Sequence, residues 1–143
     1  MEQPRYFEGY AIGAWGTTSG RTITETDLVV HAGHTGGFFP RHLDAGVMPT
    51  QPFSHRIAHG TMVFSTGVGL TAGVINPAAF SYGYDRLRFV RPVFIGDMIH
   101  TRVTITGKQD DPKRAEAGRV TERTEVVNRK GEVLLAADHI YVV

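Results

Sequence analysis

The longest apolar stretch of the chain runs from Ile57 to Ile75, and no polar face interrupts it. Its large side chains are interleaved with glycine, alanine and serine rather than with charged residues. A helix that is apolar on every side is typically buried. Because a glycine inside a helix costs about 1 kcal/mol relative to alanine, the many glycines here indicate close packing against a sheet. The pattern therefore predicts a buried central helix that ends near Asn76-Pro77, where proline stops it.

The chain after this helix alternates apolar and polar residues with the period of a β-strand. In one segment Ile99, Val103 and Ile105 share a face, while His100 and Thr104 point to the other. The predicted strands are 82–90, 98–106, 119–128 and 132–143, with a polar turn region at 107–118. The last two strands are expected to form a hairpin across residues 128–131.

The residues before the apolar stretch predict shorter elements. Thr24 and Asp27 resemble a capping box, which marks the start of a helix. In order, we expect a surface arm over 1–9, a strand at Tyr10–Trp15, a turn at 16–20, a short strand at 21–23, a helix over 25–33 and a long loop over 34–56 with one helical turn at Leu43–Val47. A loop of that length in a compact domain is usually functional or disordered. Its aromatic and aliphatic content argues against disorder.

Together these elements predict an α+β fold in which a curved antiparallel sheet covers one long central helix. The 143 residues suit one domain, 1–143, with a single core. Such a unit leaves an edge strand and part of the helix uncovered, and a second copy could cover both. We therefore expect a homodimer.

Composition narrows the class of protein. The formal net charge is +1 and no run of five like charges occurs, so nothing indicates a nucleic acid or membrane partner. The chain has no cysteine, which excludes a thiol nucleophile. The N-terminal residues show no charged-then-apolar leader, and the apolar stretch is too short to span a bilayer. We expect a cytoplasmic enzyme or binding protein.

The candidate chemistry lies in the loop before the central helix. Pro40 keeps Phe39 out of a helical conformation, so we expect an ordered segment that presents His42 as a general acid or base. His59 and Gly60 stand where the helix begins, and free N–H groups of a first helical turn suit a developing oxyanion. This corner is therefore a candidate carbonyl-binding site.

Several neighbouring residues allow two interpretations. Asp44 could orient His42 or could cap a local turn. His59 could face a ligand or could fix the loop, and we favour the structural role. Ser65 could line the site or could hydrogen-bond within its own helix. His31 and His34 share a helix face, but no ligand set completes a metal site. The arginines Arg86, Arg88 and Arg91 could be plain surface charge or could meet phosphates.

These residues resemble the MaoC-like dehydratases and (R)-specific enoyl-CoA hydratases of the hotdog fold. The family motif reads approximately Asp-x-Asn-Pro-x-His-x-Asp and is followed by an Ile-x-His-Gly helix start. The matching residues are Pro40, His42, Asp44, Ile57, His59, Gly60 and Ser65. The resemblance implies a hotdog fold, binding of a CoA thioester as substrate and no further cofactor or metal. It also implies site roles for Pro40, Phe39 and His59 in substrate binding, and for His42, Gly60 and Ser65 in catalysis.

The chain departs from the motif at its first letter. The position of the family's catalytic aspartate is Gly37, and Phe39 replaces the usual asparagine. In such hydratases the aspartate and the histidine together activate water for addition to the enoyl double bond. Loss of the aspartate therefore implies impaired hydration, unless another group such as His34 replaces it.

Three functions remain on these grounds. The first is an acyl-CoA hydratase or dehydratase, weakened by Gly37. The second is a non-catalytic protein or subunit that binds acyl thioesters. The third, a hotdog thioesterase, requires a carboxylate on the central helix, and residues 57–75 contain none.

Overall fold

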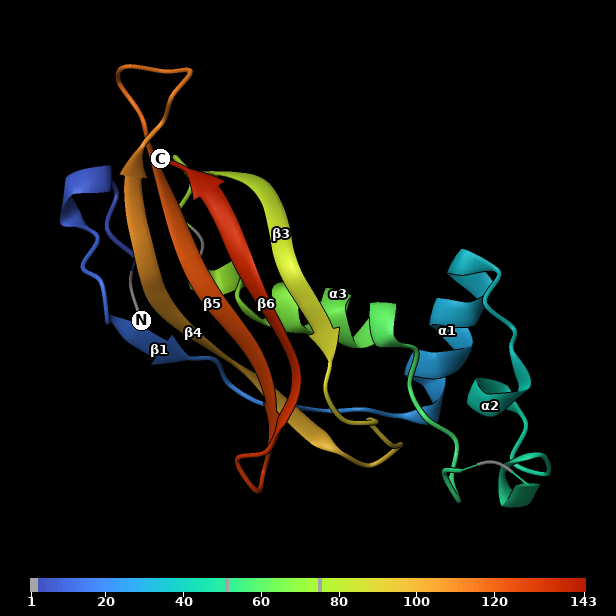
Figure 1. Ribbon diagram of the computed structural model, residues 1–143. Helices are drawn as coiled ribbons and strands as arrows, with labels where there is room; N and C mark the ends of the chain where they lie inside the picture. The colour runs from blue at the N-terminus through green and yellow to red at the C-terminus, as the bar shows by residue number, and fades with distance from the viewer. Residues whose placement is uncertain (1–2, 51, 75) are drawn as a thin grey trace.

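The computed structural model describes residues 3–50, 52–74 and 76–143. Within them, one antiparallel sheet carries the fold. Its strands are β1 (Trp15–Thr17), β4 (Met98–Asp110), β5 (Gly118–Asn128), β6 (Val133–Val142) and β3 (Phe80–Phe89) in that spatial order, and β2 (Arg21–Thr22) also pairs with β4. The sheet is curved, and α3 (Gly60–Leu70) lies against it (Figure 1). The predicted arrangement of a curved antiparallel sheet around a central helix is confirmed.

Two further helices lie beyond one end of the sheet (Figure 1): α1 (Glu25–Thr35) and α2 (Pro40–Leu43). Three short 3₁₀ turns, η1 (Phe7–Gly9), η2 (Met48–Thr50) and η3 (Ala72–Val74), complete the helical elements of the described residues. The start of α1 is the predicted capping box, in which the Thr24 N–H donates to the Asp27 carboxylate at 2.7 Å. The helix continues two residues past the predicted end, because Gly36, at φ 78°, supplies the left-handed cap.

The central helix differs from its prediction in extent and burial. It begins at Gly60, since Ile57 instead forms an isolated β-bridge with Phe94. It ends at Leu70, and the predicted end at Ile75 lies outside the described residues. Its fully buried residues are Met62, Val63 and Gly67. The prediction of burial on all sides is wrong for the isolated chain, because the sheet covers one side of the helix only.

Gly67 is the point of closest approach between α3 and the sheet. A Cβ atom at this position would lie 2.5 Å from Cγ2 of Val126, which is itself buried. The Thr101 hydroxyl donates to the Gly67 carbonyl at 2.8 Å. The glycine is therefore required by packing, as its place in an apolar helix indicated.

Replacing Gly67 by alanine should lower the free energy of unfolding. Overpacking costs about 1–3 kcal/mol, which exceeds the roughly 1 kcal/mol that alanine gains in helix propensity. Gly69 is the matched control, because it lies on the same helix and a Cβ atom added there would have no atom within 4 Å. Gly69→Ala should leave stability unchanged or raise it. Urea denaturation of both variants tests this, and equal effects at the two positions would contradict the packing argument.

The strands agree with the predicted ones except where a strand is longer, shifts its pairing register or begins at a different residue. The predicted turn at 107–118 is too long, because β4 passes a register shift after Ile105 and remains paired to Asp110. In β3 the expected alternation fails after Asp85, where the register also shifts and Arg86 takes a positive φ of 51°. The predicted strand at Tyr10–Trp15 is displaced to β1. The hairpin joining β5 to β6 forms where expected, with Gly131 at φ 79°.

No helix of the described residues is long and apolar enough to cross a bilayer. The core lies between α3 and the sheet. Its most buried large side chains are Ile23, Leu28, Ile99, Val126 and Leu135. A smaller cluster of Tyr10, Ile105, Val120 and Tyr141 fills the other end of the sheet.

Candidate active site

His42 sits on the short helix α2, which Pro40 opens at its first position. Phe39 is extended, at φ −65° and ψ 134°, as a residue before proline should be. The helical turn predicted at Leu43–Val47 lies instead at Pro40–Leu43. The His42 Nδ1 lies 2.7 Å from the Ile57 carbonyl oxygen, to which only an N–H can donate. In the neutral ring this contact leaves Nε2 unprotonated and able to accept a proton.

His59 stacks on His42 and fixes the loop beneath it. The two rings are 3.8 Å apart between centroids and nearly parallel, at 24°. The His59 Nε2–H donates to the Gly37 carbonyl at 2.7 Å, and its side chain is buried. The preceding residue, Ala58, donates its N–H to the Val93 carbonyl at 2.7 Å. The structural role favoured for His59 agrees with these contacts, although its ring also lines the cavity described below.

Position 37 faces this histidine pair. A Cβ atom added to Gly37 would lie 3.4 Å from Nε2 of His59 and 3.2 Å from the Thr35 hydroxyl. A longer side chain there would thus start beside the His59 ring and the Thr35 hydroxyl. The position at which this chain carries glycine in place of the motif's aspartate is therefore located at the histidines.

Gly60 begins α3 and lies against an aromatic ring from β3. A Cβ atom at Gly60 would be 2.7 Å from the Phe89 ring, so a side chain there would displace that ring. Among the described residues, no acceptor takes the Gly60 N–H. Helix starts leave such donors without partners inside the helix.

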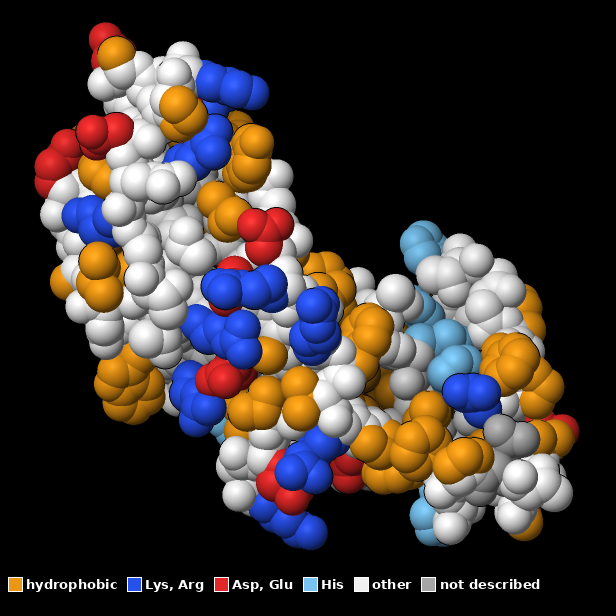
Figure 2. Space-filling view, viewed as in Figure 1, with side chains coloured by type: hydrophobic (Ala, Val, Ile, Leu, Met, Phe, Trp, Pro, Cys, Tyr) orange, Lys and Arg blue, Asp and Glu red, His pale blue; other side chains and the backbone are white. Residues whose placement is uncertain are grey.

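His42, His59 and Gly60 open into one cavity of about 680 Å³. Apolar side chains dominate its walls, which also include Phe39, Phe53, Val63, Phe89 and Leu134. In the space-filling view the histidines gather over α1 and α2, next to apolar side chains (Figure 2). Cavities of this size and character usually bind small organic molecules.

Similarity to known proteins agrees with this geometry. The family model described as "MaoC like domain" matches residues 12–128. The chain belongs to the MaoC-like domain family. It is 38% identical over 106 residues to Protein MaoC of Klebsiella aerogenes. The aligned region is 73% of this chain and 31% of that protein. It is 32% identical over 113 residues to the (R)-specific enoyl-CoA hydratase of Rhodospirillum rubrum. The aligned region is 76% of this chain and 74% of the hydratase.

Solved structures show the same fold. The monoamine oxidase regulatory protein from Archaeoglobus fulgidus has a TM-score of 0.89 at 35% identity, covering 96% of this chain and 93% of that one. A Mycobacterium tuberculosis protein described as a double hotdog fold has a TM-score of 0.77 at 22% identity, covering 96% of this chain and 43% of that one. This MaoC-like domain is thus a hotdog fold, and it spans about a third of Protein MaoC.

Burial lowers the pKa of His42 below its ordinary value of 6.5. The hydrogen bond to the Ile57 carbonyl opposes this shift, whereas positive charge on His59, Arg41 and His31 adds to it. The imidazole of His42 is accordingly neutral at pH 7. A neutral ring with Nε2 unprotonated can take a proton from water.

Other predicted residues of this MaoC-like domain lie in a second hollow, between α1 and α3. Ser65 and His34 line this hollow of about 560 Å³ and do not line the cavity of His42. His31, rather than His34, reaches the histidine pair, with its ring centroid 4.8 Å from that of His59. The described residues contain no group of three potential metal ligands. Asp44 accepts the Gly46 N–H at 2.8 Å, which is the local turn cap.

Two arginines bring positive charge to the cavity. Arg91 lines it, as one interpretation of the sequence allowed, whereas Arg86 pairs with Asp138 and Arg88 bonds to the carbonyl of Leu87. Arg41 was missed by sequence reasoning, although it directly precedes His42. Its guanidinium stacks over Phe39 at 4.9 Å, and its Nε is buried with no partner among the described residues.

Proposed function

We propose that this MaoC-like domain is a hydratase or dehydratase that adds water to a 2-enoyl-CoA thioester, or removes it from a 3-hydroxyacyl-CoA, at reduced efficiency. The observation that carries the proposal is that His42 and the start of α3 at Gly60 line one apolar cavity. Sequence similarity to an (R)-specific enoyl-CoA hydratase supports enoyl-CoA thioesters as the substrate class. The proposal includes a place in cytoplasmic fatty-acid metabolism.

The geometry suggests a separate role for each of these residues in the reaction. The thioester carbonyl would accept the Gly60 N–H, which draws electron density from C3 of the enoyl group. The His42 Nε2 would take a proton from a water that attacks C3, and C2 would then be protonated. Phe39 and His59 would hold the acyl group, and Pro40 would keep His42 in place. Ser65 lines the hollow between α1 and α3 instead of this cavity, so the expected catalytic role of Ser65 has no part in this scheme.

Arg41 and Arg91 would bind the anionic part of the substrate. Both line the cavity wall, and guanidinium groups match phosphate oxygens in a bidentate manner. The CoA end of the substrate would then lie at the mouth of the cavity near α2.

A second function is supported by the absence of carboxylates at the site. No acidic residue is among the described residues that line the cavity of His42. A pocket without the second proton-handling group could bind acyl thioesters and leave them unchanged. A thioesterase is disfavoured for the same reason, since it needs a carboxylate at the thioester carbonyl.

The exposed edge of the sheet supports the expected homodimer. Edge strand β3 presents Phe80, Tyr82 and Phe89 to solvent, with Phe80 75% exposed. Large exposed apolar groups on an unpaired edge favour association with a second strand. Light scattering should give a molar mass twice that of the chain. A molar mass equal to that of one chain would contradict the homodimer.

The proposed function is tested by the absorbance of the enoyl-thioester band when the protein is mixed with short and medium 2-enoyl-CoAs. Loss of absorbance establishes hydration. Calorimetry with the same thioesters decides between the two functions when absorbance is constant. Binding without loss of absorbance would establish the non-catalytic protein, and neither binding nor loss would overturn both.

The pH dependence of hydration should follow the lowered pKa of His42. If neutral His42 acts as the base, activity is present above its pKa and declines as pH falls through it. Because burial depresses that pKa, the pH at which kcat/KM is half its maximal value should lie below 6.5. A half-maximal value at or above pH 6.5 would contradict the assignment of this residue as the base.

A further inference from the structure

The cavity of His42 lacks the second group that the family motif supplies. In that motif an aspartate shares the activation of water with the histidine, and this chain carries Gly37 at the position of the aspartate. No acidic residue is among the described residues that line the cavity. Hydration still requires a group that holds the water against C3 of the enoyl thioester. That group has to come from the remaining polar side chains of the cavity wall.

Few polar side chains line this cavity. Among the described residues they are Arg41, His42, His59, Thr61 and Arg91. The two arginines can only donate hydrogen bonds and do not give up a proton in proteins. His59 donates its Nε2–H to the Gly37 carbonyl, and its Nδ1 is buried away from solvent. Apart from His42, Thr61 is therefore the side chain of this wall that can accept a hydrogen bond from a water in the cavity.

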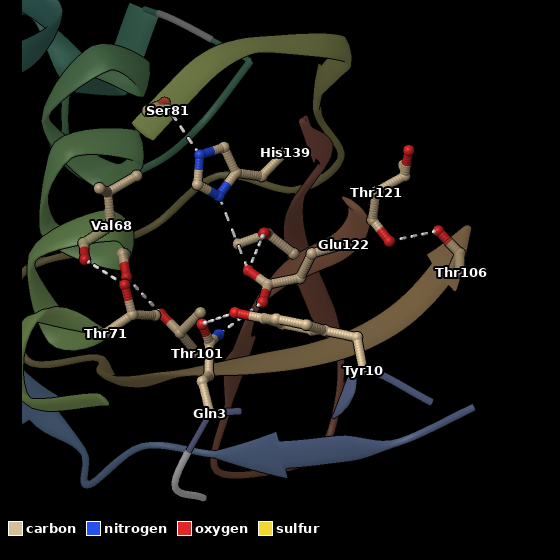
Figure 3. A network of polar contacts seen from close by, with 12 residues as sticks. Gln3, Tyr10, Val68, Thr71, Ser81, Thr101, Thr106, Thr121, Glu122 and His139 are labelled. Carbon is tan, nitrogen blue, oxygen red and sulfur yellow. Dashed lines mark hydrogen bonds and ion pairs between the residues drawn. The ribbon is translucent and has the colours of Figure 1, made fainter. Parts of the chain in front are cut away.

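A carboxylate and an imidazole do meet elsewhere in the fold. Oε1 of Glu122 lies 3.8 Å from Nδ1 of His139, and the two residues come from the paired strands β5 and β6 (Figure 3). Both residues line a separate cavity past the last turn of α3, and neither lines the cavity of His42. This pair therefore does not replace the aspartate of the motif.

Thr61 is the second residue of α3 and directly follows Gly60. Its side chain is accessible to water, and its Oγ1 lies 3.1 Å from Nε2 of His31 on α1. A threonine hydroxyl carries one proton and two lone pairs. When Nε2 of His31 accepts the hydrogen bond of that proton, the lone pairs of Oγ1 stay free for another donor. A water in the cavity can be that donor.

The surroundings of His31 favour the neutral ring that this arrangement needs. Burial lowers the pKa of His31 below its ordinary value of 6.5, and positive charge on His59 and His34 lowers it further. The His59 ring is the nearer of these, with its centroid 4.8 Å from that of His31. A neutral imidazole has one nitrogen without a proton. Nε2 of His31 can therefore accept from Thr61 at pH 7.

We propose that the Thr61 hydroxyl holds the attacking water in place of the missing carboxylate, and that His31 positions this hydroxyl. The inference rests on the hydratase function proposed above. Thr61 is a catalytic residue in this scheme, because it contacts the reacting water. His31 is a positioning residue, because it acts through Thr61.

The reaction balances with water as the only added reagent. The water oxygen bonds to C3 while one of its protons passes to Nε2 of His42. The other proton stays on that oxygen, hydrogen-bonded to Oγ1 of Thr61, and becomes the hydroxyl proton of the product. The electron pair of the double bond moves to C2, which takes the proton from His42. The net change is enoyl thioester plus water to 3-hydroxyacyl thioester.

Thr61→Val removes the hydroxyl and keeps the branched shape of the side chain. We expect kcat for hydration of crotonyl-CoA to fall about tenfold, the usual effect of one hydrogen bond, with KM little changed. Thr61→Ser keeps the hydroxyl and should retain most of the activity. Thr66→Val is the matched control, because Thr66 lies on the same helix and lines the hollow between α1 and α3 instead. An unchanged kcat in Thr61→Val, or an equal fall in Thr61→Ser, would overturn the proposal.

His31→Phe separates positioning from packing. Phenylalanine keeps a ring against His59 but has no nitrogen to accept from Thr61, so kcat should fall as it does in Thr61→Val. Because both residues act through one hydrogen bond, the double variant should be no slower than either single variant. His34→Phe, on the same helix, is the control and should hydrate like the natural chain. Full activity in His31→Phe would show that His31 only packs against its neighbours.

A double-mutant cycle with Gly37→Asp tests whether Thr61 does the work of the missing carboxylate. When a carboxylate at position 37 can hold the water, Thr61→Val should cost less than in the natural chain. An equal cost in both backgrounds would overturn this part of the proposal. If the natural chain hydrates no 2-enoyl-CoA, the proposed function fails and this inference fails with it. Hydration that is indifferent to Thr61 and His31 overturns this inference alone.

Discussion

Replacement of His42 by alanine should lower the rate of 2-enoyl-CoA hydration by about 10²–10⁴-fold, the usual worth of a general acid or base. Its Nδ1 is committed to the Ile57 carbonyl, so Nε2 alone can exchange protons with water. Because the thioester is held by the cavity walls and the Gly60 N–H, its dissociation constant should change little. Loss of absorbance at the enoyl-thioester band and calorimetric titration measure the two quantities separately.

His55→Ala is the matched control for this experiment. His55 is an exposed histidine of the same loop and does not line the cavity of His42. Its replacement should leave hydration unchanged. If His42→Ala hydrates as fast as the natural chain, His42 is not the acid or base, and another group of the cavity must transfer the proton.

Restoring a carboxylate with Gly37→Asp should raise the hydration rate, by as much as about 10²-fold if the missing group accounts for one proton transfer. The new Cβ would lie 3.2–3.4 Å from the Thr35 hydroxyl and the His59 ring, so these two side chains would have to shift by a few tenths of an ångström. The carboxylate would begin beside His59, which stacks on His42. Steady-state kinetics with a crotonyl-type thioester measures the gain.

Gly37→Ala separates the carboxylate from the mere presence of a side chain. It adds the same Cβ without the charge, so its rate should equal that of the natural chain or fall below it. Equal rates for the alanine and aspartate variants would show that position 37 does not correspond to the family's catalytic aspartate.

The sequence predicted the elements whose signals are local. The capping box at Thr24 located the start of α1, and Pro40 correctly indicated an extended Phe39. The start of α3 was less predictable, since the apolar residues before Gly60 are satisfied by a bridge to a distant loop rather than by a helix. Burial of α3 was overestimated because composition does not tell which sides of a helix its own chain covers.

Site residues could be predicted where a short sequence motif contains them. They could not be predicted where the pairing of distant strands brings them together. Pro-x-His and His-Gly led to His42 and Gly60, which do line one cavity. Which histidine of α1 reaches His59 depends on the side of the helix that it occupies. That histidine is His31 rather than His34. Val103, Glu122 and Tyr141 line one cavity although they lie far apart in the chain, because the pairing of β4, β5 and β6 joins them.

On α3, the tight contact of Gly67 with Val126 lies between Val63, which lines the cavity of His42, and Val68, which lines a separate cavity of about 330 Å³. One opens at the first turn of α3 and the other past its last turn, and neither shares a wall residue with the other. Substitutions at sites without common partners usually act additively. Natural selection could therefore reshape one cavity while the other keeps its form.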